Sequence, residues 1–179
     1  MTESRRAGKA PPATQGAEAA AVSEVTRALS GYVATAGQQL PEQVAEKSKH
    51  HLLDTLAAMV SGSRLLPGRR AIAYARAQGG RRQATVAGAR FLTSTVNAAQ
   101  ANGMCAHADE SDDSHLRGRF HPGCAVVPAA LAAAELAGRD GPSLLRAVAL
   151  GYDIGARFVL ALGLGGGVGH RAPRCSVAR

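Results

Sequence analysis

The sequence contains no tryptophan, and Phe and Tyr together supply only 3% of its 179 residues. Aromatic rings usually provide a large share of the apolar area of a protein core, so this core is expected to consist of small side chains. Glycine alone accounts for 21 residues. Small side chains allow helices to approach one another closely, and at this length the composition favours helices packed in one domain.

Cysteine is also scarce. Cys105, Cys124 and Cys175 are odd in number and show no C-x-x-C spacing, which argues against a disulfide framework or a common zinc motif. A reducing cytoplasm is therefore the expected location. Cys105 and Cys124 are most simply small buried side chains.

Long hydrophobic runs are missing. The longest apolar segment, residues 144–164, is interrupted by Arg146, Asp153 and Arg157, and such charges are costly inside a lipid bilayer. No membrane partner is therefore expected. Residues 1–21 lack the apolar stretch of a secretory signal, and we expect them to form a disordered tail.

Acidic residues are outnumbered by basic ones, and the formal net charge is +8. One segment carries seven arginines and no acidic residue, and this basic run could bind phosphate or an acidic substrate. Because Tyr74 is the single aromatic residue interleaved with it, base stacking has little support, a solvated basic face is favoured and no nucleic-acid partner is expected. The run consists of Arg64, Arg69, Arg70, Arg76, Arg81, Arg82 and Arg90.

Apolar residues recur with the helical period in six segments bounded by Gly, Pro or a capping residue. The predicted helices span residues 22–36, 41–62, 67–78, 94–107, 129–137 and 140–162. Only residues 84–87 suggest a strand. The sequence thus predicts an all-α domain over residues 22–162 with at most one short β segment, followed by an irregular tail at residues 163–179.

Gly151 and Gly155 lie four residues apart in the last predicted helix. Glycine is unfavourable inside a helix, so we expect this stripe of small residues to receive another helix. If that helix belongs to a missing part of the protein, the stripe stays uncovered and the chain should self-associate.

The segment from His107 to Gly123 contains three of the six histidines and four of the thirteen acidic residues. Each titratable group must stay hydrated or find a partner, which makes such a concentration costly. Pro122 biases His121 toward an extended backbone, so the His-Pro pair predicts a stiff loop.

Three interpretations of this cluster remain open. The side chains could bind a divalent metal, although their spacing matches no specific metal motif. They could instead act as acids and bases on a bound substrate. The third interpretation is structural: a helix C-terminus followed by a polar loop, with carboxylates that cap helices and pair with Arg117 and Arg119. His50 and His51, in a predicted helix, are expected to have packing or surface roles.

Two motifs within this region are N-G-M-C-A-H-A-D-E-S-D-D-S-H and H-P-G-C-A-V-V-P-A-A-L-A-A-A-E. Together they resemble the signature of the MmgE/PrpD family, which includes 2-methylcitrate dehydratase and cis-aconitate decarboxylase. The segments H-L-L-D-T-L-A-A-M-V-S-G-S and L-L-R-A-V-A-L-G-Y-D-I-G-A-R-F resemble the family's helices before and after that signature. The resemblance covers about residues 25–162.

The resemblance implies the N-terminal part of a helical domain, accompanied in the family by a smaller α+β domain. It further implies a lyase acting on small di- or tricarboxylates, a homodimer, and no required metal or other cofactor. An isomerase or epimerase of the same acids is the nearest alternative activity. A non-catalytic helical interaction fragment and a metal-dependent hydrolase are the alternatives from other classes.

The family's functional residues can be carried over onto matching positions. Glu110 takes the position of an Asp, Ser114 that of a Thr or Ser, and His121 that of the His-Pro histidine, so these three are the predicted catalytic residues. Glu110 is one methylene longer than the family residue. The predicted substrate-binding residues are His107, Asp112, Asp113, His115, Arg117 and Arg119.

The resemblance also bears on length. Family members are several hundred residues long, and their other functional residues lie beyond the position of Arg157. A truncated or frame-shifted gene explains the Arg-, Gly- and Pro-rich tail at residues 163–179. We therefore expect the chain alone to have little or no lyase activity.

Overall fold

The computed structural model describes residues 23–36 and 39–163, which form six helices and two short strands. The elements are α1 (Glu24–Thr35), α2 (Glu42–Gly62), α3 (Leu66–Gln78), β1 (Ala84–Thr85), β2 (Leu92–Thr93), α4 (Thr95–Ala106), α5 (Gly123–Leu136) and α6 (Gly141–Ala161). The predicted all-α class is confirmed. The tails predicted at residues 1–21 and 163–179 lie, except for Gly163, outside the described residues.

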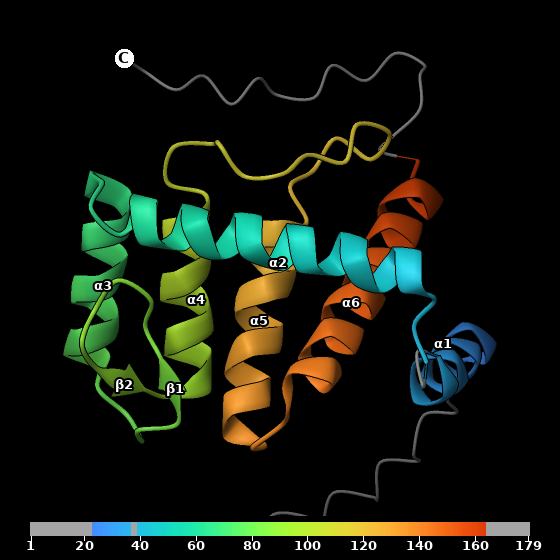
Figure 1. Ribbon diagram of the computed structural model, residues 1–179, viewed down its shortest axis with the longest axis horizontal. Helices are drawn as coiled ribbons and strands as arrows, with labels where there is room; N and C mark the ends of the chain where they lie inside the picture. Colours follow the sequence, from blue (N-terminus) through green and yellow to red (C-terminus); the bar gives the residue numbers. More distant parts are fainter. Residues whose placement is uncertain (1–22, 37–38, 164–179) are drawn as a thin grey trace, which may run out of the picture. The chain divides into compact units, whose positions relative to one another are not determined.

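Helix α1 forms a unit separate from the remaining helices and contains no buried residue. Its first turn is capped by Ser23, whose hydroxyl accepts a hydrogen bond from the Thr26 amide at 3.1 Å. In the other unit, α3, α4, α5 and α6 lie side by side and α2 runs across them (Figure 1). None of the described helices is both long and apolar enough to span a membrane.

The core of the larger unit consists of small side chains, as the composition predicts. One buried cluster joins α2, α4, α5 and α6 through Met59, Cys105, Ala106, Val127 and Val148. A second cluster lies near the strands and contains Ala75, Ala84, Val86, Ala98, Ala101 and Ala132. These small residues let the helices of this unit pack closely against one another.

Strands β1 and β2 pair as an antiparallel hairpin, whereas the sequence suggests only the first of them. A two-residue strand is too short to show an alternating pattern, so β2 leaves no signal of its own. The buried amide of Asn102 holds the hairpin against α4, because it accepts from the Ala87 amide at 2.8 Å and donates to the Thr85 carbonyl at 2.9 Å.

Helix α5 begins at Gly123, six residues before the predicted start at residue 129. Pro122 adopts helical angles (φ −69°, ψ −35°) at the N-cap, and Pro128 lies within the helix. Proline cannot donate a backbone hydrogen bond, so Pro128 leaves the Cys124 carbonyl without its usual helical donor. Gly103 of α4 packs against this carbonyl, where an added Cβ would lie 2.8 Å from the oxygen.

Gly151 and Gly155 are covered within the chain. A Cβ at Gly151 would lie 2.5 Å from Cγ1 of Val126 in α5, and one at Gly155 would lie 3.7 Å from the Phe120 ring. The expectation that a helix packs on this stripe is therefore confirmed. The expectation that the stripe has no partner in this chain is wrong, because α5 and the preceding loop occupy it.

Candidate active site

The loop from His107 to Pro122 carries every predicted site residue, and both of its ends are fixed by helices. His107 is the C-cap of α4, and Pro122 is the N-cap of α5. Within the loop, the His115 amide donates to the Phe120 carbonyl at 2.9 Å, which closes a tight turn between them. The turn places Arg117 at the surface.

Asp112 lies between two histidines, and its side chain is completely buried. The His107 Nδ1 donates to the carboxylate, with distances of 3.0 Å and 3.2 Å to the two oxygens. The His121 Nδ1 lies 3.6 Å from Oδ1, which is too long for a hydrogen bond. Among residues 39–163, no hydrogen-bond partner reaches this buried His121 nitrogen. The arrangement can therefore hold a proton or pass one between an imidazole and a carboxylate.

Asp113 makes a separate set of contacts with three helices. Its Oδ1 accepts from the Gly123 amide at the start of α5 at 2.8 Å, and its Oδ2 accepts from the Tyr152 hydroxyl of α6 at 2.7 Å. The His51 Nδ1 of α2 lies 3.2 Å from the same Oδ2. A carboxylate at a helix N-terminus is favoured by the helix dipole, so Asp113 stabilises α5 while it fixes the loop.

Gly123 is required at this place because three polar side chains crowd its α-carbon. A Cβ there would lie 2.6 Å from the Asp113 carboxylate, 2.7 Å from the Thr55 hydroxyl and 2.9 Å from the Tyr152 hydroxyl. Thr55 is buried and donates to the His51 carbonyl at 2.9 Å. The glycine of the H-P-G motif thus allows the loop to contact α2 and α6.

Tyr152 remains a neutral hydrogen-bond donor over a wide pH range. Burial raises the pKa of its hydroxyl strongly, and the neighbouring Asp113 carboxylate raises this pKa further. The Tyr152 ring also packs against the His51 imidazole, with 4.7 Å between the ring centroids. Tyr152 therefore connects α6 both to Asp113 and to His51 of α2.

Cys124 lies in the first turn of α5, next to the Asp112 pair. Its thiol donates to the His121 carbonyl at 3.3 Å. Burial, followed by the Asp112 and Asp113 carboxylates, raises the pKa of the thiol to about 12. His107, Asp112 and Cys124 are also the described residues whose side chains could together hold a metal ion.

The remaining predicted residues of the loop lie near or at its surface. Glu110, Ser114, Arg117 and Arg119 are exposed. In the part of the chain that the structure describes, neither arginine forms an ion pair with a carboxylate. The predicted pairing of the carboxylates with these arginines is therefore wrong, since Asp112 and Asp113 contact histidines instead. The predicted capping is confirmed for Asp113, which accepts from the Gly123 amide at the start of α5.

Two of these residues adopt a strained backbone. Glu110 has φ +56° and Arg119 has φ +52°, a region that residues other than glycine rarely occupy. Asp and Asn tolerate this conformation better than Glu because their short side chains can bond to the local backbone. Such strain often occurs where a loop is held for binding or catalysis.

His115 is half-buried, and its contacts are with other residues of the same loop. Its Nδ1 accepts a hydrogen bond from the Gly118 amide at 3.0 Å, and its ring packs against Phe120 with 5.4 Å between centroids. The neutral ring therefore carries its proton on Nε2, which is the nitrogen left for another partner.

Sequence reasoning missed His51 and Tyr152 as neighbours of the loop. His51 and Thr55 share one face of α2 at a spacing of four residues, and this spacing was the available signal. The spacing does not show which carboxylate from a distant part of the sequence faces His51 and Thr55. The expectation of a packing role for His51 is incomplete, because His51 also contacts Asp113.

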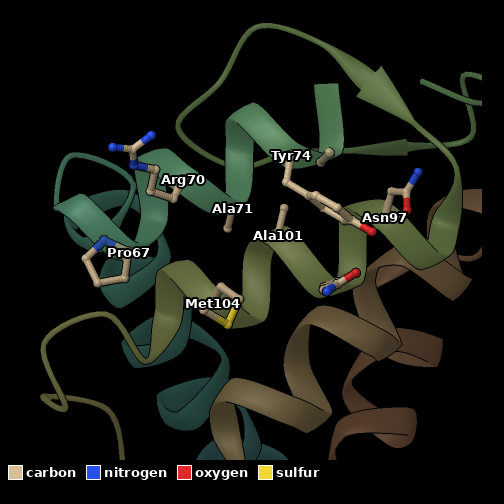
Figure 2. A pocket seen from close by; sticks show the side chains of 9 residues that line it. Pro67, Arg70, Ala71, Tyr74, Asn97, Ala101 and Met104 are labelled. Carbon is tan, nitrogen blue, oxygen red and sulfur yellow. The ribbon is translucent and has the colours of Figure 1, made fainter. Parts of the chain in front are cut away.

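Two cavities were compared with the position of this loop. A groove of about 290 Å³ between α3 and α4 includes none of the predicted site residues, and Tyr74, Asn97 and Met104 line it (Figure 2). A second cavity of about 270 Å³ lies between α2 and α6 and includes His51 and Tyr152 in its wall. We place the candidate site at the loop because the titratable groups converge there, not in the larger groove.

Comparison with known families identifies the chain. The family model described as the MmgE/PrpD N-terminal domain matches residues 27–171. No curated protein and no solved structure matches the chain. The family match covers most of the sequence and includes the whole loop, and the helical fold agrees with it. The chain therefore belongs to the MmgE/PrpD family, whose members are dehydratases and related lyases.

Proposed function

We propose that the loop from His107 to Pro122 forms part of the active site of a lyase that removes water or carbon dioxide from a small di- or tricarboxylate. The observation that carries this proposal is the placement of His121. Its Nδ1 faces a buried carboxylate, Asp112, at 3.6 Å, and its side chain is 34% exposed. A histidine held in this way can exchange a proton with a substrate at the surface through its other nitrogen, Nε2.

In the proposed dehydration, a base removes a proton from the carbon next to a carboxylate, and the electron pair forms the double bond as the hydroxyl group leaves. His121 gives a proton to the departing hydroxyl, which leaves as water. In a decarboxylation, His121 would protonate the product carbon after carbon dioxide departs. Asp112 stabilises the charged imidazole that precedes the transfer.

Substrate binding is assigned to the exposed side chains of the loop. Arg117 and Arg119 have no carboxylate partner among the described residues, and guanidinium groups bind carboxylates with paired hydrogen bonds. Glu110 and Ser114 would orient the substrate hydroxyl group. His107, Asp113 and His115 act as positioning residues, since each contacts a carboxylate, a helix or the backbone of the loop.

Polycarboxylate binding to the chain tests this proposal. Calorimetric titration with cis-aconitate and 2-methylcitrate should show binding that weakens at least tenfold in the double variant R117A/R119A. The matched control is R81A/R82A, which removes two exposed arginines of the basic run elsewhere on the chain. Equal weakening by both variants would instead indicate general attraction to a basic protein, and the proposed site would be rejected.

Product analysis separates the alternative activities. A lyase yields a product that has lost water or carbon dioxide, whereas an isomerase or epimerase yields one of unchanged composition. Nuclear magnetic resonance spectra of the substrate mixture distinguish these outcomes. Polycarboxylate binding is the primary measurement, and product analysis follows it.

A further inference from the structure

We propose that the groove between α3 and α4 binds a small amphipathic monocarboxylate of the medium-chain fatty-acid type. The apolar chain of this ligand lies in the groove, and its carboxylate pairs with Arg70 at one end. The groove has a volume of about 290 Å³ and includes no residue of the loop from His107 to Pro122. It is therefore a second site, separate from the candidate active site.

The walls of the groove are mostly apolar. Pro67, Ala71 and Tyr74 line it from α3, and Ala101 and Met104 line it from α4 (Figure 2). Tyr74 and Met104 are 53% and 49% exposed, so an apolar ligand would cover area that now faces water. Removal of such area from water favours binding.

The dimensions of the groove set the size of the ligand. Its α3 wall runs from Pro67 to Ala75, and its α4 wall runs from Asn97 to Met104. With a rise of about 1.5 Å per residue, each wall is roughly 10–12 Å long. The volume lies just below the range of about 300–1,000 Å³ that is usual for ligand pockets. A single unbranched chain of medium length therefore fits the groove.

The charges around the groove favour an anionic head group. Neither α3 nor α4 contains an acidic residue, whereas α3 carries Arg69, Arg70 and Arg76. Arg70 lines the groove, is exposed, and forms no ion pair with a carboxylate of the described residues. A guanidinium group binds a carboxylate through two parallel hydrogen bonds. Arg70 can therefore hold the charged end of the ligand.

The positions of the lining residues orient the ligand along the groove. Figure 2 shows Arg70 and Pro67 at one end and Asn97 at the other, with Tyr74 between them. A carboxylate beside Arg70 leaves the chain to run past the Tyr74 ring toward Asn97. The charged end then stays in contact with solvent while the chain is covered.

Contacts beneath the groove and at its far end fix its walls before a ligand binds. Ala75 and Ala101 line the groove and belong to the buried cluster near the strands. The Asn97 side-chain amide donates to the Gly79 carbonyl at 3.2 Å, and the Thr93 hydroxyl donates to the same carbonyl. A site formed in advance reduces the ordering cost of binding.

The proposed fatty-acid site does not rest on the proposed lyase function. The groove shares no residue with the loop, and fatty-acid binding is measured with no polycarboxylate present. Substitution of Arg70 should leave the titration with cis-aconitate unchanged, so the two proposals can fail independently.

Nuclear magnetic resonance of the full chain, with isotope-labelled methionine methyl groups, tests the proposal. Octanoate is titrated at pH 7 below its micelle-forming concentration, and M104L assigns the Met104 signal. We expect a saturable shift of that signal and little change in the signal of Met59, which is buried in the other core cluster. Octanoate should bind more tightly than butyrate, because the longer chain buries more apolar area. Non-saturating shifts, or equal shifts of the two methionines, would overturn the proposal.

Substitution of arginine tests the contact with the carboxylate. R70A should weaken octanoate binding about fivefold, as expected for an exposed ion pair, but should leave the binding of uncharged octanol nearly unchanged. The matched control is R69A, which removes the neighbouring exposed arginine outside the groove and should have little effect on either ligand. Y74A should weaken the binding of both ligands because it removes apolar wall area.

Circular dichroism checks that each of these variants is folded, and Y74A and R70A test the site independently of each other. Equal weakening of octanoate binding by R70A and R69A would overturn the proposal. Equal weakening of octanoate and octanol binding by R70A would also overturn it, because Arg70 would then not contact the carboxylate.

Discussion

Asp112 and Asp113 are neighbours in the sequence, but their carboxylates serve different parts of the molecule. Asp112 contacts His107 at the end of α4 and lies near His121, while Asp113 contacts residues of α2, α5 and α6. One pair of adjacent carboxylates thus both orients the candidate acid/base histidine and anchors the loop that carries it. We therefore expect substitution of Asp112 and substitution of Asp113 to have different effects on the protein.

Loss of the Asp113 charge should mainly reduce stability. Asp113→Asn weakens contacts with Gly123, Tyr152 and His51, and we expect a loss of roughly 1.5–3 kcal/mol in the free energy of unfolding, typical of hydrogen bonds to a charged group. Denaturant unfolding followed by circular dichroism measures the change. Asp109→Asn is the control, because within the described part of the chain the exposed Asp109 side chain bonds to its near neighbour Ser111 and to no distant residue, and little change is expected. Equal effects of the two variants would contradict the anchoring role.

The raised pKa of Tyr152 predicts a specific dependence on pH. Its pKa lies above the ordinary value of 10.0 in the folded chain, so the stabilisation linked to its protonation is complete at neutral pH. Above about pH 10 the unfolded chain loses this proton first, and stability falls as the pH rises. Tyr152→Phe should be less stable at pH 7 but should lose less stability between about pH 9 and 11 than the original chain. Parallel stability curves for the two proteins would contradict this assignment.

At the scale of the elements, the site depends on how closely α5 approaches its neighbours. Gly123 lets the Asp113 carboxylate lie against the start of α5, and Gly151 lets Val126 of α5 pack on α6. Gly103 of α4 approaches the Cys124 carbonyl that Pro128 leaves without its helical donor. The glycines of these helices therefore act at defined contacts and not as general sources of flexibility.

Two glycines of α6 provide a matched comparison. Gly151→Ala would place a methyl group 2.5 Å from stiff, β-branched Val126, whereas Gly155→Ala would meet the Phe120 ring at an ordinary 3.7 Å. Both substitutions gain the same helix propensity, so the difference in their unfolding free energies isolates the crowding, and we expect Gly151→Ala to be less stable by roughly 1–3 kcal/mol. Thermal or urea unfolding of both variants measures this. Gly155→Ala as the less stable variant would show that the packing of α5 on α6 differs from the one described.

At the scale of the whole molecule, regular helices were predictable from the sequence and contacts between distant segments were not. The periodicity of residues 41–62 and 140–162 predicts α2 and α6 because apolar residues recur along one face of each segment. The start of α5 was missed because Pro122 and Pro128 resemble breaks in a helix. The density of titratable groups revealed the loop, but the contacts of Asp113 with His51 and Tyr152 join residues far apart in the sequence. Only the packing of α2 and α6 brings those residues together.

The central claim is that His121, beside Asp112, acts on a small polycarboxylate bound to this loop. Nuclear magnetic resonance titration of the chain with cis-aconitate tests it most directly, with the ring signals of His121 followed against those of exposed His50 in α2. We expect saturable shifts of the His121 signals, small shifts of the His50 signals, and loss of the saturable response in R117A/R119A. Equal, non-saturating shifts of both histidines, or no response of His121 at concentrations that saturate binding, would contradict the account.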